Sequence, residues 1–218
     1  MLYSKRSSFL SCLLLTIGCL SSETAVQAQI SPENTIIVFD LDDVLIGIKT
    51  SKKVKFGLYL LVRPDAWGDM RKIAKHSSHA EKLIKKNKKP GFVKRLKRIK
   101  QSKKPVDGML ELLQELKQKG YTLHIASNMS QQDFEFYKNQ YSEIFSLFDA
   151  AFVIEDDNMP QKPSKRYFDL YRATFPTEKH HFFIDDKKEN CDASGFSYTH
   201  IFKNAQSLHS DFKTRGIL

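Results

Sequence analysis

The sequence predicts an α/β fold in which helices wind around both faces of a parallel sheet, a doubly wound arrangement. Five short apolar runs, each the length of a buried strand, alternate with segments of helical periodicity. Most of the runs are rich in Ile, Val or Phe, and strands that are apolar throughout are typical of a parallel sheet covered on both faces. The expected strands are residues 35–39, 122–126, 150–154, 181–184 and 198–202.

The first 28 residues are expected to lie outside this fold. Lys5 and Arg6 precede an apolar run over 9–20 that is too short to span a bilayer comfortably, and residues 26–28 fit a signal-peptidase site. We interpret 1–28 as a signal peptide and the protein as exported, either periplasmic or secreted. Two alternatives stay open: lipid attachment at Cys19, which lacks the usual Leu three residues earlier, and an uncleaved membrane anchor.

The segment after the first expected strand differs in charge from the rest of the chain. The 218 residues carry a formal net charge of +10, and residues 49–104 alone hold 20 Lys or Arg against three acidic residues. Within them Phe92, Leu96 and Ile99 recur at helical spacing. We expect a small, mainly helical, basic cap inserted into the core. The predicted division is 49–104 for the cap and 29–48 with 105–218 for the core.

The following helix is the clearest one in the sequence. Met109, Leu112, Leu113 and Leu116 form one apolar stripe, and Gly120 is placed to end the helix before the next strand. The composition also excludes several classes of protein. Three Cys are too few for a disulfide scaffold, and no Cys-x-x-Cys or paired-His spacing indicates structural zinc.

Polar side chains follow the expected strands where each strand ends. Open parallel sheets bind ligands at this edge. Carboxylates gathered there repel one another unless a cation binds, and such oxygen ligands suit Mg²⁺ rather than zinc. The candidate site residues are Asp40 and Asp42 after the first strand, Ser127 and Asn128 after the second, Lys162 on the loop that leaves the third, and Asp185 and Asp186 after the fourth.

These residue types fit the transfer of a phosphoryl group. Asp40 can attack phosphorus and form an aspartyl-phosphate, which divides one difficult displacement into two easier ones. Asp42 projects on the same side of an extended strand end, where it can protonate the leaving oxygen and then activate water. Ser127, Lys162 and the metal would stabilise charge on the phosphoryl group. Each residue alone also has a structural explanation, such as a helix cap, a solvated lysine or a turn.

Four segments of the chain, IIVFDLDDVL, LHIASN, QKPSKRYF and FFIDDKKEN, resemble in order the four motifs of the haloacid dehalogenase (HAD) superfamily. The resemblance covers about residues 35–202, and the flanking segments are most similar to the subfamily with a helical cap between the first two motifs. It implies Asp40 as nucleophile, Asp42 as acid and base, and Ser127 and Lys162 as phosphate ligands. Asn128, which also follows the second strand, is a further candidate for substrate binding. The implied Mg²⁺ ligands are Asp40, the Asp42 backbone carbonyl, and Asp185 or Asp186.

The retained Asp42 distinguishes between the activities of that superfamily, since its dehalogenases lack the second Asp of the first motif. We therefore predict a Mg²⁺-dependent phosphomonoesterase that acts on a small, anionic, phosphorylated substrate. Two alternatives remain open. The first is a protein on the same scaffold whose basic cap binds anionic lipid or polymers with little turnover. The second is phosphoryl transfer between two substrates, as in mutases.

Overall fold

The computed structural model describes residues 30–48, 55, 58, 90–156 and 158–218. The expected signal peptide at 1–28 and most of the expected cap therefore lie outside the described residues, and the limits of the cap stay a prediction. None of the described helices is long and apolar enough to cross a membrane.

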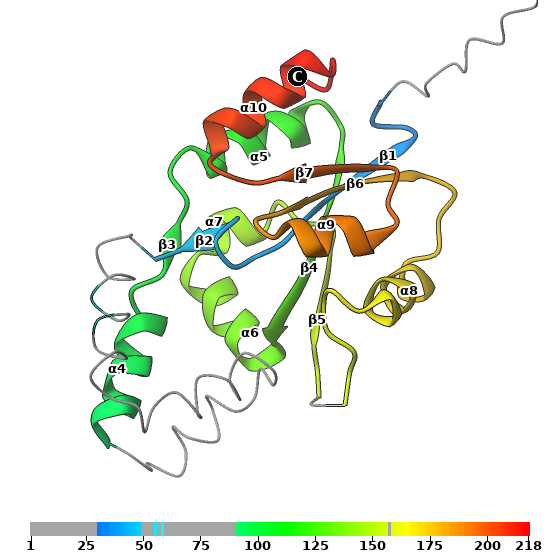
Figure 1. Ribbon diagram of the computed structural model, residues 1–218. Coiled ribbons are helices and arrows are strands. Elements are labelled where there is room, and N and C mark those ends of the chain that lie inside the picture. Colours follow the sequence, from blue (N-terminus) through cyan, green and yellow to red (C-terminus); the bar gives the residue numbers. More distant parts are fainter. Residues whose placement is uncertain (1–29, 49–54, 56–57, 59–89, 157) are drawn as a thin grey trace, which may run out of the picture.

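A five-stranded parallel sheet forms the centre of the described chain, with the strand order β5-β4-β1-β6-β7 (Figure 1). All five strands predicted from the sequence are confirmed. The largest difference is at β4, which continues past its expected end at 126 because pairing with β5 resumes at Ser130 after an irregularity. The strands are β1 Thr35–Phe39, β4 Thr122–Ser130, β5 Ala150–Ile154, β6 His180–Asp185 and β7 Tyr198–Ile201.

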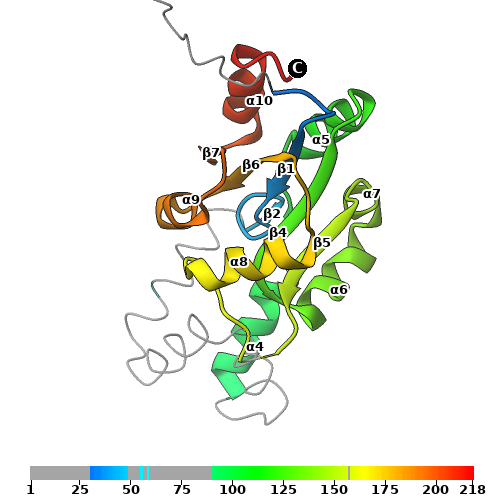
Figure 2. The ribbon, with the colours of Figure 1, turned by 90° about the vertical axis from the view of Figure 1, so that its right-hand side faces the viewer.

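Helices cover both faces of the sheet (Figure 2). Alternate residues of β1 enter different cores: Ile37 and Phe39 join one apolar cluster, and Ile36 and Val38 join the other. This double burial explains why the strands are apolar throughout, and it confirms the doubly wound fold. The first cluster includes α5 Met109–Gln118, α6 Gln131–Gln140, α7 Ser142–Phe145 and α10 Ala205–Thr214, and the second includes α8 Lys165–Thr174 and α9 Lys188–Ser194.

Helix α5 follows the predicted pattern. Its four stripe residues are all buried, and Gly120, just beyond the helix end, has a φ of 87°, a conformation that glycine adopts without the steric cost of a Cβ. The predicted helix and its stop are therefore confirmed.

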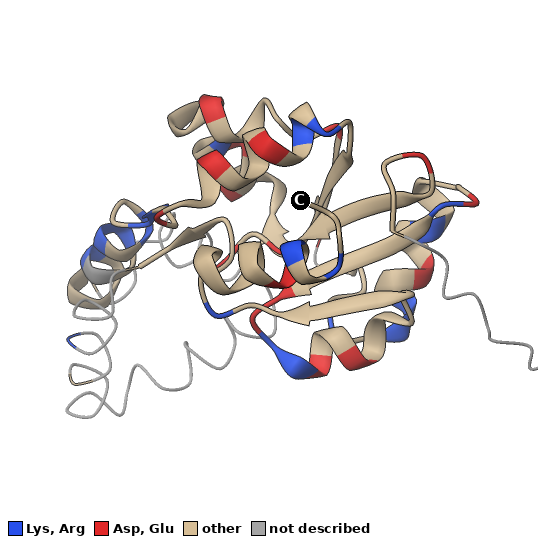
Figure 3. Ribbon diagram, turned by 90° about the horizontal axis from the view of Figure 1, so that it is seen from above, with Lys and Arg blue, Asp and Glu red and all other residues tan. Residues whose placement is uncertain are grey.

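The basic insertion joins the core through a small two-stranded sheet. β2 (Ile46–Gly47) pairs with β3 (Lys104–Pro105) in antiparallel register, so the chain leaves and re-enters the core side by side. Between them α4 (Pro90–Lys100) confirms the helix expected from the spacing of Phe92, Leu96 and Ile99, with Phe92 and Val93 buried. The helix contains no acidic residue, and its Lys and Arg positions are coloured blue on the ribbon in Figure 3.

A buried histidine lies at the amino end of β6, away from the strand ends that carry the candidate site. His181 stacks on Phe196 with ring centroids 4.7 Å apart, and its Nε2 has no hydrogen-bond partner in the part of the chain that the structure describes. Burial, with smaller contributions from His124 and Arg172, lowers the pKa of His181 from its usual 6.5 to about 4.

This histidine should make the fold less stable in mild acid. Its folded pKa is below its unfolded pKa, so the unfolded chain takes up the proton first and stability falls as the pH drops from about 7 towards 4. Between pH 7 and pH 5 we expect His181 to lower the free energy of unfolding by roughly 2 kcal/mol. Urea denaturation at both pH values should show that stability falls less in His181→Phe than in the wild type. If the control His180→Phe, at the less buried neighbour, weakened the pH dependence equally, His181 would not be its source.

Candidate active site

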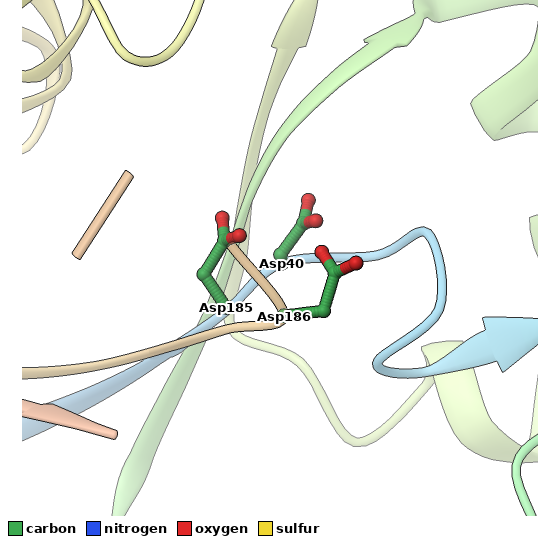
Figure 4. Close-up of side chains that lie close together, drawn as sticks. All are labelled: Asp40, Asp185 and Asp186. Carbon is green, nitrogen blue, oxygen red and sulfur yellow. The ribbon is translucent and has the colours of Figure 1, made fainter. Parts of the chain in front are cut away.

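Three carboxylates meet at the carboxyl end of the sheet (Figure 4). Asp40 follows β1, Asp185 ends β6 and Asp186 comes next, and one oxygen from each lies within 4.8 Å of the others. The pairing of the two strands creates this arrangement, because the Asp40 N–H donates to the Ile184 carbonyl at 2.8 Å. The predicted convergence of these acidic residues is what the described chain shows.

Lys162 provides the counter-charge. Its Nζ lies 2.8 Å from Asp40 Oδ1 and 2.6 Å from Asp185 Oδ2, and it donates to the Ala126 carbonyl at 2.9 Å. The lysine is 6% exposed, Asp40 5% and Asp185 0%. Charges this deeply buried are costly unless they are paired and hydrogen-bonded, so the lysine is what allows two carboxylates to be buried together.

Burial and the neighbouring charges shift the pKa values of the groups in the site. Burial raises the pKa of Asp40, with Lys162 opposing and Asp185 adding to the shift. Burial would lower the pKa of Lys162, but the two carboxylates outweigh it and raise the pKa, which keeps the ammonium charged. Burial also raises the pKa of Asp186. The cluster holds three carboxyl groups, and the Lys162 ammonium is paired with two of them, Asp40 and Asp185.

The remaining donor atoms fit a hard divalent cation. Asp186 Oδ1 is buried and has no hydrogen-bond partner among the described residues, a costly state for a carboxylate oxygen. Figure 4 shows this carboxylate beside those of Asp40 and Asp185. Oxygen donors at a water-accessible edge suit Mg²⁺. Residues of this type, in this arrangement, can hold that ion.

Asp185 differs from Asp186 in how fully its oxygens are bonded. The Asn190 amide donates to both Asp185 oxygens at 2.9 Å, and the Lys187 N–H donates to Oδ1 at 2.9 Å. With Lys162 also bound, both Asp185 oxygens already accept several hydrogen bonds and have few lone pairs left for a metal ion. This favours Asp186 as the direct metal ligand beside Asp40, and Asp185 as the residue that fixes Lys162.

Asp42 lies apart from the three clustered carboxylates. Its side chain forms an ion pair with Lys103 and is 47% exposed. The chain turns sharply after it, with Asp43 at a φ of 61° and the Asp43 N–H donating to the Ile46 carbonyl at 2.7 Å. Asp42 was predicted among the metal residues, but its carboxylate is not part of the described cluster. Its backbone carbonyl as a metal ligand stays a prediction.

The two residues predicted beside the phosphate occupy different surroundings. Ser127 is buried, and its Oγ accepts a hydrogen bond from the Met129 N–H at 3.3 Å. The Asn128 side chain forms two hydrogen bonds with the backbone of Lys162. Its Oδ1 accepts from the backbone N–H of the lysine at 2.8 Å, and its Nδ2 donates to the backbone carbonyl of the lysine at 2.9 Å. Asn128 therefore holds the lysine loop in place, and substrate binding by either residue stays a prediction.

A cavity of about 800 Å³ opens beside the acidic cluster. Its walls include Asp43 and Asp186 on the site side, with Lys104 from β3 and Lys203 after β7. Of the three clustered carboxylates, Asp186 is the one that lines this cavity, which leaves space for a small molecule beside it.

The sequence model of the haloacid dehalogenase-like hydrolases matches residues 67–197, more than half of the chain. The chain belongs to this family. No curated protein matches it in sequence.

Solved structures of HAD hydrolases share the fold. A variant of a HAD family enzyme from Bacteroides thetaiotaomicron, in complex with magnesium and inorganic phosphate, has a TM-score of 0.57 and 17% identity over 78% of this chain and 95% of that one. A HAD hydrolase from Bacillus subtilis bound to magnesium has a TM-score of 0.55 and 16% identity, over 83% of this chain and 99% of that one. A dehalogenase has a TM-score of 0.53 and 16% identity, over 76% of this chain and 82% of that one.

The sequence did not predict the contacts that Asn190 and Lys103 make in this HAD hydrolase. Asn190 follows Asp185 by five positions and reaches back from α9, a contact that the motif FFIDDKKEN suggests only once a helix is placed there. Lys103 is one of 20 basic residues in its segment, and nothing in the sequence distinguishes it from the others.

Proposed function

We propose that the chain hydrolyses phosphomonoesters with Mg²⁺ through an aspartyl-phosphate on Asp40. The observation that supports this most directly is the cluster of Asp40, Asp185 and Asp186 around Lys162, with one oxygen of Asp186 unpartnered within the described part of the chain. Magnesium and inorganic phosphate are bound together in the Bacteroides enzyme of the same fold, and we extend that pair of ligands to this chain.

The first step forms the covalent intermediate. A carboxylate oxygen of Asp40 bonds to phosphorus, the bond from phosphorus to the ester oxygen breaks, and the leaving oxygen takes a proton from Asp42. The Lys162 ammonium, held at Asp40 by Asp185, stabilises the added negative charge on the phosphoryl oxygens.

The second step releases phosphate. A water oxygen bonds to phosphorus, the bond to Asp40 breaks, and Asp42 accepts the proton that the water loses. Inorganic phosphate leaves and the Asp40 carboxylate is restored. The metal would be held by Asp40, Asp186 and the Asp42 carbonyl, and when bound it supplies positive charge to neutralise the phosphate oxygens.

The substrate class follows from charge and space. The cavity beside Asp186 has room for a small molecule, and the basic α4, with the exposed Lys94 and Lys97, would raise the local concentration of anions. With export as predicted from residues 1–28, the enzyme would act outside the cytoplasm.

A panel of phosphoesters tests the activity. With Mg²⁺, the purified protein should release inorganic phosphate from aryl phosphates and from at least one class among nucleotides, sugar phosphates and phosphopeptides. EDTA should stop turnover and added Mg²⁺ should restore it, because the acidic cluster would lose the charge that balances it.

Three outcomes would contradict the proposal. Turnover that is insensitive to EDTA would remove the metal role. Halide release from 2-haloacids without phosphate release would indicate dehalogenase chemistry. Salt-sensitive binding to anionic vesicles or polymers, with no turnover across the panel, would favour the binding protein.

A further inference from the structure

The segment that connects α4 to β3 brings a lysine to Asp42. This segment, residues 101–103, is called the connector here. The Lys103 ammonium pairs with Asp42 Oδ1, and the lysine side chain is 17% exposed although its partner is 47% exposed. Its Nζ also lies 5.6 Å from the centroid of the Tyr137 ring. The pair is therefore partly shielded from water, which makes it stronger than an ordinary surface ion pair.

Helix α6 and Tyr141, the residue directly after it, fix the backbone that carries this lysine. The Tyr141 hydroxyl donates to the Lys103 carbonyl at 2.7 Å, and the Tyr137 hydroxyl donates to the Lys100 carbonyl at 2.9 Å. One turn earlier on α6, Asp133 pairs with the Lys100 ammonium. Because α6 directly follows β4, these interactions tie the end of α4 and the connector to the strand that carries Ser127.

We propose that Lys103 is a positioning residue that orients Asp42 for the second step of the reaction, the attack of water on the aspartyl-phosphate. The inference rests on the proposed function. A half-exposed carboxylate on its own samples several rotamers, and the ion pair selects one of them. The bond takes Oδ1 and leaves Oδ2 to receive the proton.

The proton and the bonds balance within that step. The water oxygen bonds to phosphorus, the bond from phosphorus to the Asp40 oxygen breaks, and one water proton moves to Asp42 Oδ2. Inorganic phosphate leaves. Lys103 keeps its proton throughout and touches neither phosphorus nor water, so its effect is exerted through Asp42.

Steady-state kinetics with p-nitrophenyl phosphate separate the two steps. The aryl oxide is a good leaving group that needs little help from an acid, so formation of the phosphoenzyme should be insensitive to Lys103. In Lys103→Met we expect kcat and KM to fall together by about tenfold with kcat/KM nearly unchanged, because breakdown of the intermediate becomes limiting. Acid quenching should trap a larger phosphoenzyme fraction.

Three further variants make the test specific. Lys103→Arg keeps a cation beside Asp42 and should restore most of kcat. Lys213→Met removes one charge from an exposed position on α10, to which no part in binding or catalysis is assigned, and should leave the kinetics unaltered. In an Asp42→Asn background, Lys103→Met should cause no further loss, since the residue through which it acts is gone.

Several results would overturn the proposal. One is a fall in kcat/KM as large as that in kcat, since this would mean that Lys103 attracts substrate. Another is an additive loss in the double variant, and a third is no change in an active, folded Lys103→Met protein. A wild type without any phosphatase activity would overturn the proposed function as well, so the two failures are distinguishable.

Discussion

Asp40→Asn should abolish phosphoester hydrolysis while the protein stays folded. The amide that replaces the carboxylate is a poor nucleophile for phosphorus, so we expect the rate of phosphate release to fall by ~10³-fold or more. The side chain keeps its size, and the surrounding strands β1 and β6 keep their pairing through the Asp40 N–H. Phosphate release and urea denaturation on the same preparation measure both effects.

The stability of Asp40→Asn tests the effect of burial on the Asp40 carboxyl group. Burial raises the pKa of Asp40, so the folded chain holds this proton more tightly than the unfolded chain does. Ionisation of Asp40 therefore costs folding free energy, and this cost grows as the pH rises above the unfolded pKa and is complete above the folded pKa. The amide removes that cost. The free energy of unfolding at neutral pH should therefore not be lower in Asp40→Asn than in the wild type.

Asp192→Asn, at an exposed position on α9, is the matched control and should keep both activity and stability. Full activity in Asp40→Asn would show that another group attacks phosphorus and would refute the assignment.

Lys162→Met should cost both stability and activity. Removing one partner of a buried charge pair costs roughly 3–5 kcal/mol, and here two buried carboxylates lose the same cation. The rate should also fall by about 10²-fold or more, because the ammonium that stabilises the phosphoryl oxygens is gone. Urea denaturation at neutral pH and phosphate release measure these two losses.

The stability loss in this variant should depend on pH. Without the lysine, the folded pKa of Asp40 rises further above its unfolded value, so protonation favours the folded chain. Relative to the wild type, the variant should therefore recover stability as the pH falls from 7 to 5. The control is Lys165→Met, whose exposed pair with Asp169 contributes little. Equal losses of stability in the two variants would show that Lys162 has no special role.

The strands were predictable because a parallel sheet covered on both faces requires apolar residues at every position. The 35–39 and 150–154 runs match β1 and β5 residue for residue. The end of β4 was not predictable, since Ser127 and Asn128 interrupt the apolar pattern while the strand continues to Ser130. Pairing with a neighbouring strand, rather than local composition, decides where such a strand stops.

The candidate site was predictable to the extent that strand ends define it. Asp40, Asp185 and Asp186 converge because β1 and β6 are neighbours with parallel register. The interactions of Asn128 and Lys103 depend instead on contacts across 34 and 61 residues. No spacing in the sequence encodes them, because they arise only when loops from distant parts of the chain are packed together.

The pairing of β2 with β3 has a consequence for how such an enzyme can diversify. Gly47 and Lys104 are directly opposite each other, so the two attachment points of the inserted segment are neighbours whatever lies between them. An insertion mounted this way can be lengthened, shortened or exchanged without straining the scaffold beneath it. The inserted segment can thus vary in length and sequence while the acidic cluster at the strand ends keeps its arrangement.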